Sequence, residues 1–385
     1  MCKFIQTTED LNSLCERLAR HPFVTVDTEF IREKTYWPRV CLIQIASVDE
    51  ACCVDPLAQG IDLTALFELM RNKDVVKVFH AARQDIEIFY HLDGCTPYPV
   101  FDTQLAAMVC GFGESVSYQN LVQKMLGIEL DKSMRFTDWS RRPLTEKQIV
   151  YALADVTHLR DIYKKMRDLL TETGRTHWVD DDTAFLVNPA TYENDSSAVW
   201  KRLKINSNKP VYLAMCQALA AYREDEAKRL DRPRKHIMRD EILLEIAANM
   251  PSDAEEMAKM RGLPQGFANG RMGREILKII ADVKSRDPST YPAVPKPYEL
   301  PRSARSVSKM LRLLLMIKSA ECDVAEKLIA SPDELDMLAG EKNPDLDVLK
   351  GWRYEVFGKD ALKLKAGKIA MRYSPERHRI DLTEL

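Results

Sequence analysis

The sequence lacks the features that mark disulfide-rich, zinc-binding, membrane-spanning or nucleotide-driven proteins. Its nine cysteines include no C-x-x-C pair, so we expect neither a disulfide framework nor a zinc finger. The longest apolar run, Leu311–Ile317, is too short to cross a bilayer, and the start, MCKFIQTTED, has no apolar signal segment. No G-x-x-x-x-G-K-[ST] loop occurs, which excludes a helicase. These absences predict a cytoplasmic protein with reduced thiols and no membrane segment.

Glycine is also scarce, with 14 residues in a chain of 385, and long amphipathic stretches predict a helix-rich protein of two or three domains. The net charge of −2 is unevenly distributed. Residues 1–199 carry 21 Lys and Arg against 30 Asp and Glu, whereas residues 200–385 carry 35 against 28. The basic second half is suited to binding a polyanion through its phosphates, although ordinary surface charge explains the same balance.

The first half has the pattern of an α/β domain, which we place at residues 1–195. The stretches FVTVDTEF, VCLIQIAS and ACCVDPLA read as three closely spaced strands, which favours an antiparallel meander. A helix, LTALFELMRN, and a buried strand, VVKVFHAA, follow, and helical patterns then alternate with loops to about Thr173.

The second half is predicted to consist of two small all-α domains. The first spans residues 205–287 and the second spans residues 303–372, where DELDMLAG weakly repeats the DAEEMAKM of the first. Five prolines between Pro288 and Pro301 predict a stiff linker at 288–302. Residues 373–385 read as an untethered tail.

Five residues that could form a catalytic site lie on three predicted elements. Asp27 and Glu29 share one face of a strand, Asp85 opens a helix directly after a later strand, and Tyr151 and Asp155 share one face of a late helix. Each group taken alone has an ordinary explanation. Asp27 and Glu29 could lie on a solvated strand face, Asp85 could cap its helix, and Tyr151 and Asp155 could be a pair on a helix surface. Taken together, closely spaced carboxylates repel one another, and a divalent cation is their usual partner.

The order and flanks of these residues resemble the ribonuclease D family, the tyrosine-bearing subclass of exonucleases with four acidic residues. The matching segments are VDTEFIREKTYWPRVCLIQIA, VFHAARQDIEIF, DTQLAA and DKSMRFTDWSRRPLTEKQIVYALADV. The stretch from Tyr222 to Pro264 resembles the helicase-and-RNase-D C-terminal (HRDC) module, and the second helical block resembles it only loosely, most clearly in GWRYEVFG. The resemblance implies a ribonuclease H-like mixed sheet flanked by helices, followed by two HRDC-like modules.

The resemblance also implies a reaction and roles for the site residues. The expected reaction is 3′→5′ hydrolysis of RNA that releases nucleoside 5′-monophosphates with two divalent cations, Mg²⁺ or Mn²⁺. Asp27 would bind both cations, Glu29 and Asp155 would complete the site of the cation that activates water, and Asp85 would serve the cation at the leaving oxygen. Tyr151 would orient the attacking water.

Residues that could contact RNA are predicted in three places. His80 and Gln84 precede Asp85, although His80 could equally be a satisfied histidine at a strand end. The loop before the catalytic helix contains Lys132, Arg141 and Arg142, and its Trp139 is better explained as a packing anchor than as a base-stacking residue. The densest basic stretch, KRLDRPRKHIMR, offers further candidates, of which we single out Arg232, Arg234, Lys235 and Arg239.

From the resemblance, the expected substrates are tRNA precursors and other small structured RNAs, cut by a monomer without an obligate protein partner. Two alternatives stay open at this point. One is a DNA 3′→5′ exonuclease, and the other is a catalytically silent RNA-binding scaffold on the same fold.

Overall fold

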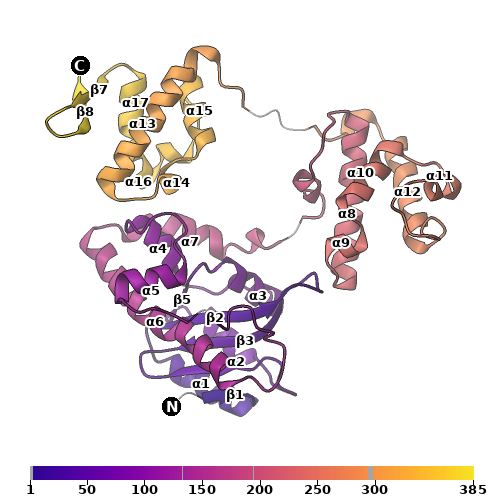
Figure 1. Ribbon diagram of the computed structural model, residues 1–385, viewed down its shortest axis with the longest axis horizontal. Coiled ribbons are helices and arrows are strands. Elements are labelled where there is room, and N and C mark those ends of the chain that lie inside the picture. The colour runs from indigo at the N-terminus through magenta and orange to yellow at the C-terminus, as the bar shows by residue number, and fades with distance from the viewer. Residues whose placement is uncertain (1–2, 132, 194, 294–297) are drawn as a thin grey trace. The chain divides into compact units, whose positions relative to one another are not determined.

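The structure is a computed structural model that describes residues 3–131, 133–193, 195–293 and 298–385 (Figure 1). The chain divides into two compact units. One unit combines residues 1–29, 41–191 and 297–385, and the other combines residues 30–40 with residues 192–296. A short segment of the N-terminal domain therefore belongs to the same unit as the first helical module. No helix in the described part is long and apolar enough to cross a membrane, and none of its eight cysteines forms a disulfide.

The N-terminal domain is built on a six-stranded mixed sheet with the order β1-β4-β3-β2-β5-β6. β1 pairs with β4, β2 with β5 and β5 with β6 in parallel, whereas β3 and β4 are antiparallel. The three strands predicted to be closely spaced are indeed neighbours, and all of β3 except Arg39 is buried. The strands are β1 (Lys3–Ile5), β2 (Phe23–Ile31), β3 (Arg39–Ala46), β4 (Ala51–Val54), β5 (Val76–Phe79) and β6 (Val100–Asp102).

Helices flank this sheet, and the longest of them, α6, contacts β4 and β5. α6 begins with a capping box, because Thr145 accepts from the Gln148 amide while the Gln148 side chain accepts from the Thr145 amide. The α/β prediction is therefore confirmed. The helices are α1 (Thr8–Leu18), α2 (Thr64–Arg71), α3 (Arg83–Asp93), α4 (Thr103–Val109), α5 (Tyr118–Leu126), α6 (Glu146–Glu172) and α7 (Asp180–Val187).

The first helical module has its own apolar core, which includes Trp200, Leu213, Leu219, Ile246 and Ile276. Its longest helix, α8, contacts α9, α10 and α12 and the short 3₁₀ helix Val199–Arg202. The module contains α8 (Pro210–Leu230), α9 (Arg234–Ile237), α10 (Asp240–Asn249), α11 (Ala254–Ala258) and α12 (Arg271–Ser285).

The second helical module packs on the N-terminal domain and shares an apolar core with it. Leu311, Leu314 and Phe357 of the module belong to the same buried cluster as Ile162 and Met166 of α6. Its helices are α13 (Arg305–Cys322), α14 (Glu326–Ile329), α15 (Pro332–Gly340), α16 (Gly351–Arg353) and α17 (Lys359–Lys365), with a π-helical turn at Tyr354–Gly358. The tail is not untethered as predicted, because β7 (Ile369–Ser374) and β8 (Arg379–Glu384) form an antiparallel hairpin.

The two helical modules share a local feature that supports the predicted repeat. α8 ends at Asp231 and α13 ends at Asp323, and both aspartates adopt the left-handed conformation, with φ of 47° and 52°. A four-residue helix, α9 or α14, follows each of them. Non-glycine residues rarely adopt positive φ, and the repeat itself stays a prediction.

Candidate active site

The first wall of the candidate site is strand β2. Thr25, Asp27 and Glu29 alternate along the strand and therefore lie on one of its faces. The Thr25 hydroxyl donates a hydrogen bond of 2.8 Å to the carbonyl of Val156 on α6. This bond fixes β2 against α6 directly beside the acidic residues.

The second wall is the first part of helix α6. Tyr151 and Asp155 lie one helical turn apart and both line the same pocket as Asp27 and Glu29. One carboxylate oxygen from each of Asp27, Glu29 and Asp155 lies within 4.8 Å of the others. The structure thus brings together acidic residues that are 128 positions apart in the sequence, as predicted.

Asp85 lies in the first turn of α3 but does not cap that helix. Ala82 occupies the cap position and makes no side-chain cap bond, whereas the buried Asp85 carboxylate accepts a 2.5 Å hydrogen bond from the Thr28 hydroxyl on β2. Asp85 is not one of the three residues in the closest acidic group, although its charge raises the pKa of Glu29. Of the two alternatives left open for Asp85, the geometry therefore favours a place beside the acidic group over a cap.

The turn before α3 is held by Asp102, a residue to which the sequence analysis gave no role. Ala81 adopts a positive φ of 60°, which costs a non-glycine residue about 1–2 kcal/mol. The Asp102 carboxylate accepts hydrogen bonds from the amides of Ala81, Ala82 and Gln104, at 3.0, 2.9 and 2.7 Å. Asp102 thereby stabilises the strained turn that presents Asp85 to the site.

Burial and mutual repulsion disfavour the ionised forms of the carboxyl groups in the site. Burial, followed by the charge of Asp27, raises the pKa of Glu29 to about 9, and burial raises the pKa of Asp155 to about 7. Burial and then a neighbouring carboxylate also raise the pKa values of Asp27 and Asp85. Hard oxygen ligands that carry excess negative charge are the ligands that Mg²⁺ and Mn²⁺ prefer, so this group fits a divalent cation.

The acidic group opens into a cavity of about 330 Å³. Its lining includes residues that the sequence analysis missed, namely Ser117, Tyr118, Gln119 and Arg135. A second cavity of about 430 Å³ also contains Gln119, Tyr151 and Asp155 in its lining. Arg135 could have been recognised, because it lies in the same basic loop as the cations that were chosen.

Comparison with known proteins agrees with this geometry. A family model described as a 3′-5′ exonuclease matches residues 2–171, and one described as an HRDC domain matches residues 213–280. The chain is 48% identical to "Ribonuclease D" of Granulibacter bethesdensis over 95% of this chain and 93% of that protein. It is 46% identical to "Ribonuclease D" of Acidiphilium cryptum over 99% of this chain and 97% of that protein. The chain belongs to the ribonuclease D family.

A solved structure supports the same conclusion for the fold. Escherichia coli RNase D, described as an exoribonuclease involved in structured RNA processing, aligns with a TM-score of 0.80 and 27% identity. The alignment covers 95% of this chain and 99% of that one. As a member of the ribonuclease D family with a matched exonuclease domain, the chain is a 3′→5′ exoribonuclease. An exonuclease of this fold depends on divalent metal, and the acidic group is the set of residues that fits it.

In this ribonuclease D family member, a buried ion pair anchors the loop before α6. Arg142 donates two hydrogen bonds, of 2.7 and 2.6 Å, to the buried carboxylate of Asp55. It donates others to the carbonyls of Cys41 and Trp139, at 2.6 and 2.8 Å. Trp139 is 2% exposed, and its ring lies 6.1 Å from that of Tyr151. The predicted packing role of Trp139 therefore agrees with its burial, and Arg142 holds the loop that packs on Tyr151.

The other predicted RNA contacts near the ribonuclease site lie in different environments. His80 lines the cavity, but Thr103 Oγ1 and the Val116 carbonyl lie 3.0 and 3.1 Å from its two ring nitrogens, and burial lowers its pKa. Gln84 is exposed and does not line the cavity, and Arg141 is exposed and bonds to Asp138. Lys132 lies outside the described residues. Contact of these residues with RNA stays a prediction.

The RNA-contacting residues predicted in the first helical module include one cation bound to a buried carboxylate and three exposed cations. Arg234 bonds to the buried carboxylate of Glu224, with one hydrogen bond of 2.6 Å, and lies over the ring of Tyr36. Arg232, Lys235 and Arg239 are exposed. Sequence alone could not separate these cations, because the distinction depends on which of them meets a buried carboxylate.

Proposed function

We propose that the chain trims the 3′ ends of tRNA precursors and other small structured RNAs and releases nucleoside 5′-monophosphates. Membership in the ribonuclease D family and the likeness to the Escherichia coli enzyme support this substrate class. The observation that carries the proposal is the group formed by Asp27, Glu29 and Asp155, whose carboxylate oxygens converge within 4.8 Å at the edge of a cavity. We further propose that the protein acts as a cytoplasmic monomer.

The proposed cofactor is a pair of divalent cations, Mg²⁺ or Mn²⁺. Asp27 would bind both, Glu29 and Asp155 would complete one site, and Asp85 would serve the other. Bound cations would supply charge neutralisation at the scissile phosphate and an acidified water. The raised pKa values of the carboxyl groups support this assignment, because a cation would offset both the burial and the mutual repulsion that raise them.

Tyr151 is proposed to orient the attacking water rather than to take its proton. Burial, followed by the charges of Asp155 and Glu29, raises the pKa of Tyr151 above its ordinary value. The phenol therefore stays protonated at neutral pH and can exchange a hydrogen bond with water. Packing of Trp139 beside its ring restricts where the hydroxyl can point.

Among the described residues, Arg135 is the cation that we propose to meet the scissile strand. It lines the cavity that contains the acidic group, and its positive charge acts on Tyr151. An arginine can donate two parallel hydrogen bonds to a phosphate, which suits a residue that positions the terminal nucleotide.

The deciding experiment uses a 5′-labelled tRNA precursor with a short 3′ trailer and a DNA strand of matched sequence. Each is incubated with the full chain in Mg²⁺, Mn²⁺ or EDTA, and the same reactions are run with Asp155→Asn. We expect a metal-dependent ladder that shortens the RNA from its 3′ end and is lost in the variant. Equal shortening of the DNA would instead indicate a DNA exonuclease, and no shortening of either strand would indicate a silent RNA-binding scaffold.

A further inference from the structure

One large apolar side chain in the loop before α6 is almost fully exposed to solvent. Phe136 is 91% exposed, more than any other large hydrophobic side chain among the described residues. Single apolar residues scattered over a surface are ordinary, so exposure alone does not assign a role to this ring. Phe136 differs from an ordinary surface residue in two respects, its fixed backbone and its place beside the candidate active site.

The backbone around Phe136 is a hydrogen-bonded turn that is tied to the start of α6. The amide and the hydroxyl of Thr137 both donate to the Met134 carbonyl, at 3.1 and 3.0 Å. The side-chain amide of Gln148, which belongs to the capping box of α6, donates to the Thr137 hydroxyl at 3.2 Å. Arg135 and Phe136 are the two central residues of this turn. The exposed ring is therefore carried by an ordered backbone rather than by a loose loop.

The Phe136 ring lies beside the cavity that contains the acidic group, which we call the catalytic cavity. Arg135, its neighbour in the turn, lines this cavity, and the Arg135 guanidinium carbon lies 5.3 Å from the centre of the Phe136 ring. The volume of the catalytic cavity, about 330 Å³, is at the small end of the range for ligand sites, which is about 300–1,000 Å³. A strand whose 3′ end enters this cavity leaves most of its nucleotides outside, where Phe136 is exposed.

Apolar surface is exposed on another side of the site as well. Ile128 and Val150 are exposed, and both line the second cavity, which has Tyr151 and Asp155 in its lining. The candidate active site is thus bordered by apolar side chains in addition to charged ones. Phosphates are held by cations, whereas the flat faces of nucleobases gain most from contact with aromatic and apolar groups. These surroundings suit the bases of a strand as well as its phosphates.

We propose that the Phe136 ring stacks on a nucleobase of the RNA strand just outside the catalytic cavity and thereby positions the 3′ end for cleavage. Every base has a π-face, so stacking holds the strand without selecting its sequence. Arg135 would meet a phosphate while Phe136 meets an adjacent base, so two neighbouring residues of one turn would supply the two kinds of contact. This role rests on the proposed function in taking RNA as the substrate.

The test is a double-mutant cycle between the ring and the base. The full chain is titrated in EDTA, where metal-dependent cleavage does not occur, against a short fluorescent single-stranded RNA and against derivatives with one abasic site at a defined distance from the 3′ end. The parent should lose about 10-fold in affinity when the abasic site falls at the stacked position. Phe136→Ala should bind the intact RNA about 10-fold more weakly and show no further loss at that position. Phe136→Trp keeps a stacking ring and should bind as the parent does.

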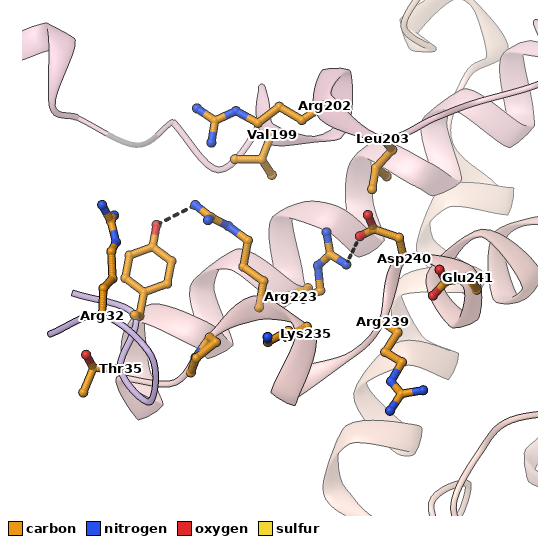
Figure 2. Close-up of a pocket in the computed structure, with 13 residues that line it drawn as sticks. Arg32, Thr35, Val199, Arg202, Leu203, Arg223, Lys235, Arg239, Asp240 and Glu241 are labelled. Atoms are coloured by element: carbon orange, nitrogen blue, oxygen red, sulfur yellow. Dashed lines mark hydrogen bonds and ion pairs between the residues drawn. The ribbon is translucent and has the colours of Figure 1, made fainter. Parts of the chain in front are cut away.

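Two control variants separate stacking from a general loss of affinity. Tyr373→Ala removes another exposed aromatic ring and should bind every RNA as the parent does. The second control carries Lys235→Gln and Arg239→Gln, two exposed cations that line a pocket of the first helical module (Figure 2). Whatever its overall affinity, its loss at each abasic site should equal that of the parent, because the Phe136 ring is still in place.

Kinetics in Mn²⁺ separate a contact with substrate from damage to the loop. The stacked nucleotide does not react, so Phe136→Ala should raise KM for removal of the first nucleotide and leave kcat within about 2-fold. A disturbed loop would instead lower kcat, because the same loop packs Trp139 beside Tyr151.

Three outcomes would overturn the stacking role. The first is parental affinity of Phe136→Ala for the intact RNA, which would leave the ring as a surface for a partner protein. The second is an abasic penalty in Phe136→Ala that equals the parent's at every position, and the third is a lowered kcat with an unchanged KM. Coupling in EDTA without shortening of RNA in Mn²⁺ would support stacking and refute the proposed function. Shortening of RNA without coupling would refute stacking and support the proposed function.

Discussion

Replacement of Arg142 by methionine tests whether the loop before α6 controls the position of Tyr151. Arg142 makes five hydrogen bonds, two to the buried Asp55 carboxylate and three to backbone carbonyls. Methionine keeps the length of the aliphatic stem and removes all five. Asp55 would retain only the weaker bonds from the Leu57 amide and the Gln6 side chain, at 3.0 and 3.3 Å.

The free-energy cost of this substitution follows from the burial of the Arg142–Asp55 ion pair and from the hydrogen bonds that Asp55 keeps. Removal of one partner from a buried ion pair costs about 3–5 kcal/mol. Because the Arg142 side chain is 24% exposed and Asp55 keeps two donors, we take the lower end, about 3 kcal/mol. If this loss of free energy destabilises only the ordered state of the loop, the fraction of molecules in which Trp139 packs beside Tyr151 falls by up to about 100-fold. We therefore expect kcat on a short RNA to fall by about 10–100-fold.

The assay is a double-mutant cycle of Arg142→Met and Asp55→Asn, with kcat and KM measured on a trinucleotide in Mn²⁺. The double variant should be no slower than Arg142→Met alone, because both changes break the same pair. The effect should fall on kcat, with a small change in KM. A normal kcat with a raised KM and a shallower salt dependence of RNA binding would refute the anchoring role and make Arg142 a phosphate contact, as the sequence alone suggested.

Three other predictions concern separate parts of the molecule. Asp155→Asn should lower activity by about 100-fold or more and weaken Mn²⁺ binding, measured by titration calorimetry. Hydrogen bonds from Arg229 and then from Arg271 lower the pKa of Glu226 from 4.5 to about 2. The ionised Glu226 therefore stabilises the folded state above about pH 4.5, and this contribution is lost as the pH falls toward 2. Glu226→Gln should therefore lower the stability of the first module at pH 7 by about 1–2 kcal/mol and flatten its acid-unfolding profile, followed by circular dichroism. Trp352 stacks on Trp178 at 4.5 Å, and Trp352→Ala should lower the stability of the unit it belongs to by about 3–5 kcal/mol, followed by thermal unfolding.

The convergence of the proposed metal ligands could be predicted from two sources, the backbone periodicity that sets which residues share a face and the resemblance to the ribonuclease D family. Alternation along β2 puts Asp27 and Glu29 on one face, and the helical period puts Tyr151 and Asp155 on another. Packing of α6 on the sheet then brings the two faces together. What the sequence could not show is the set of bonds that aligns them, such as the hydrogen bond from Thr25 to the Val156 carbonyl.

The fold was predicted less completely where distant segments meet. Nothing in a pattern of apolar residues shows that the core of the second helical module is continuous with that of α4–α6. The tail was misread although Arg379–Glu384 alternates polar and apolar residues, because a strand is stable only when it is paired and the sequence alone did not show its pairing with Ile369–Ser374.

The cations show most clearly why residue type and spacing are insufficient to assign function. Arg234 and Lys235 are adjacent in one basic stretch, yet Arg234 is held by the buried Glu224 while Lys235 is exposed. Substitution of Arg234 would leave Glu224 charged and buried without its guanidinium partner, so it would destabilise the packing of Tyr36 on the module whether or not Arg234 contacts RNA. Substitution of the exposed Lys235 removes a charge and leaves no buried carboxylate without a partner among the described residues. If substitution of a cation in this stretch weakens RNA binding, the result is therefore evidence for a phosphate contact only when that cation is not paired with a buried carboxylate.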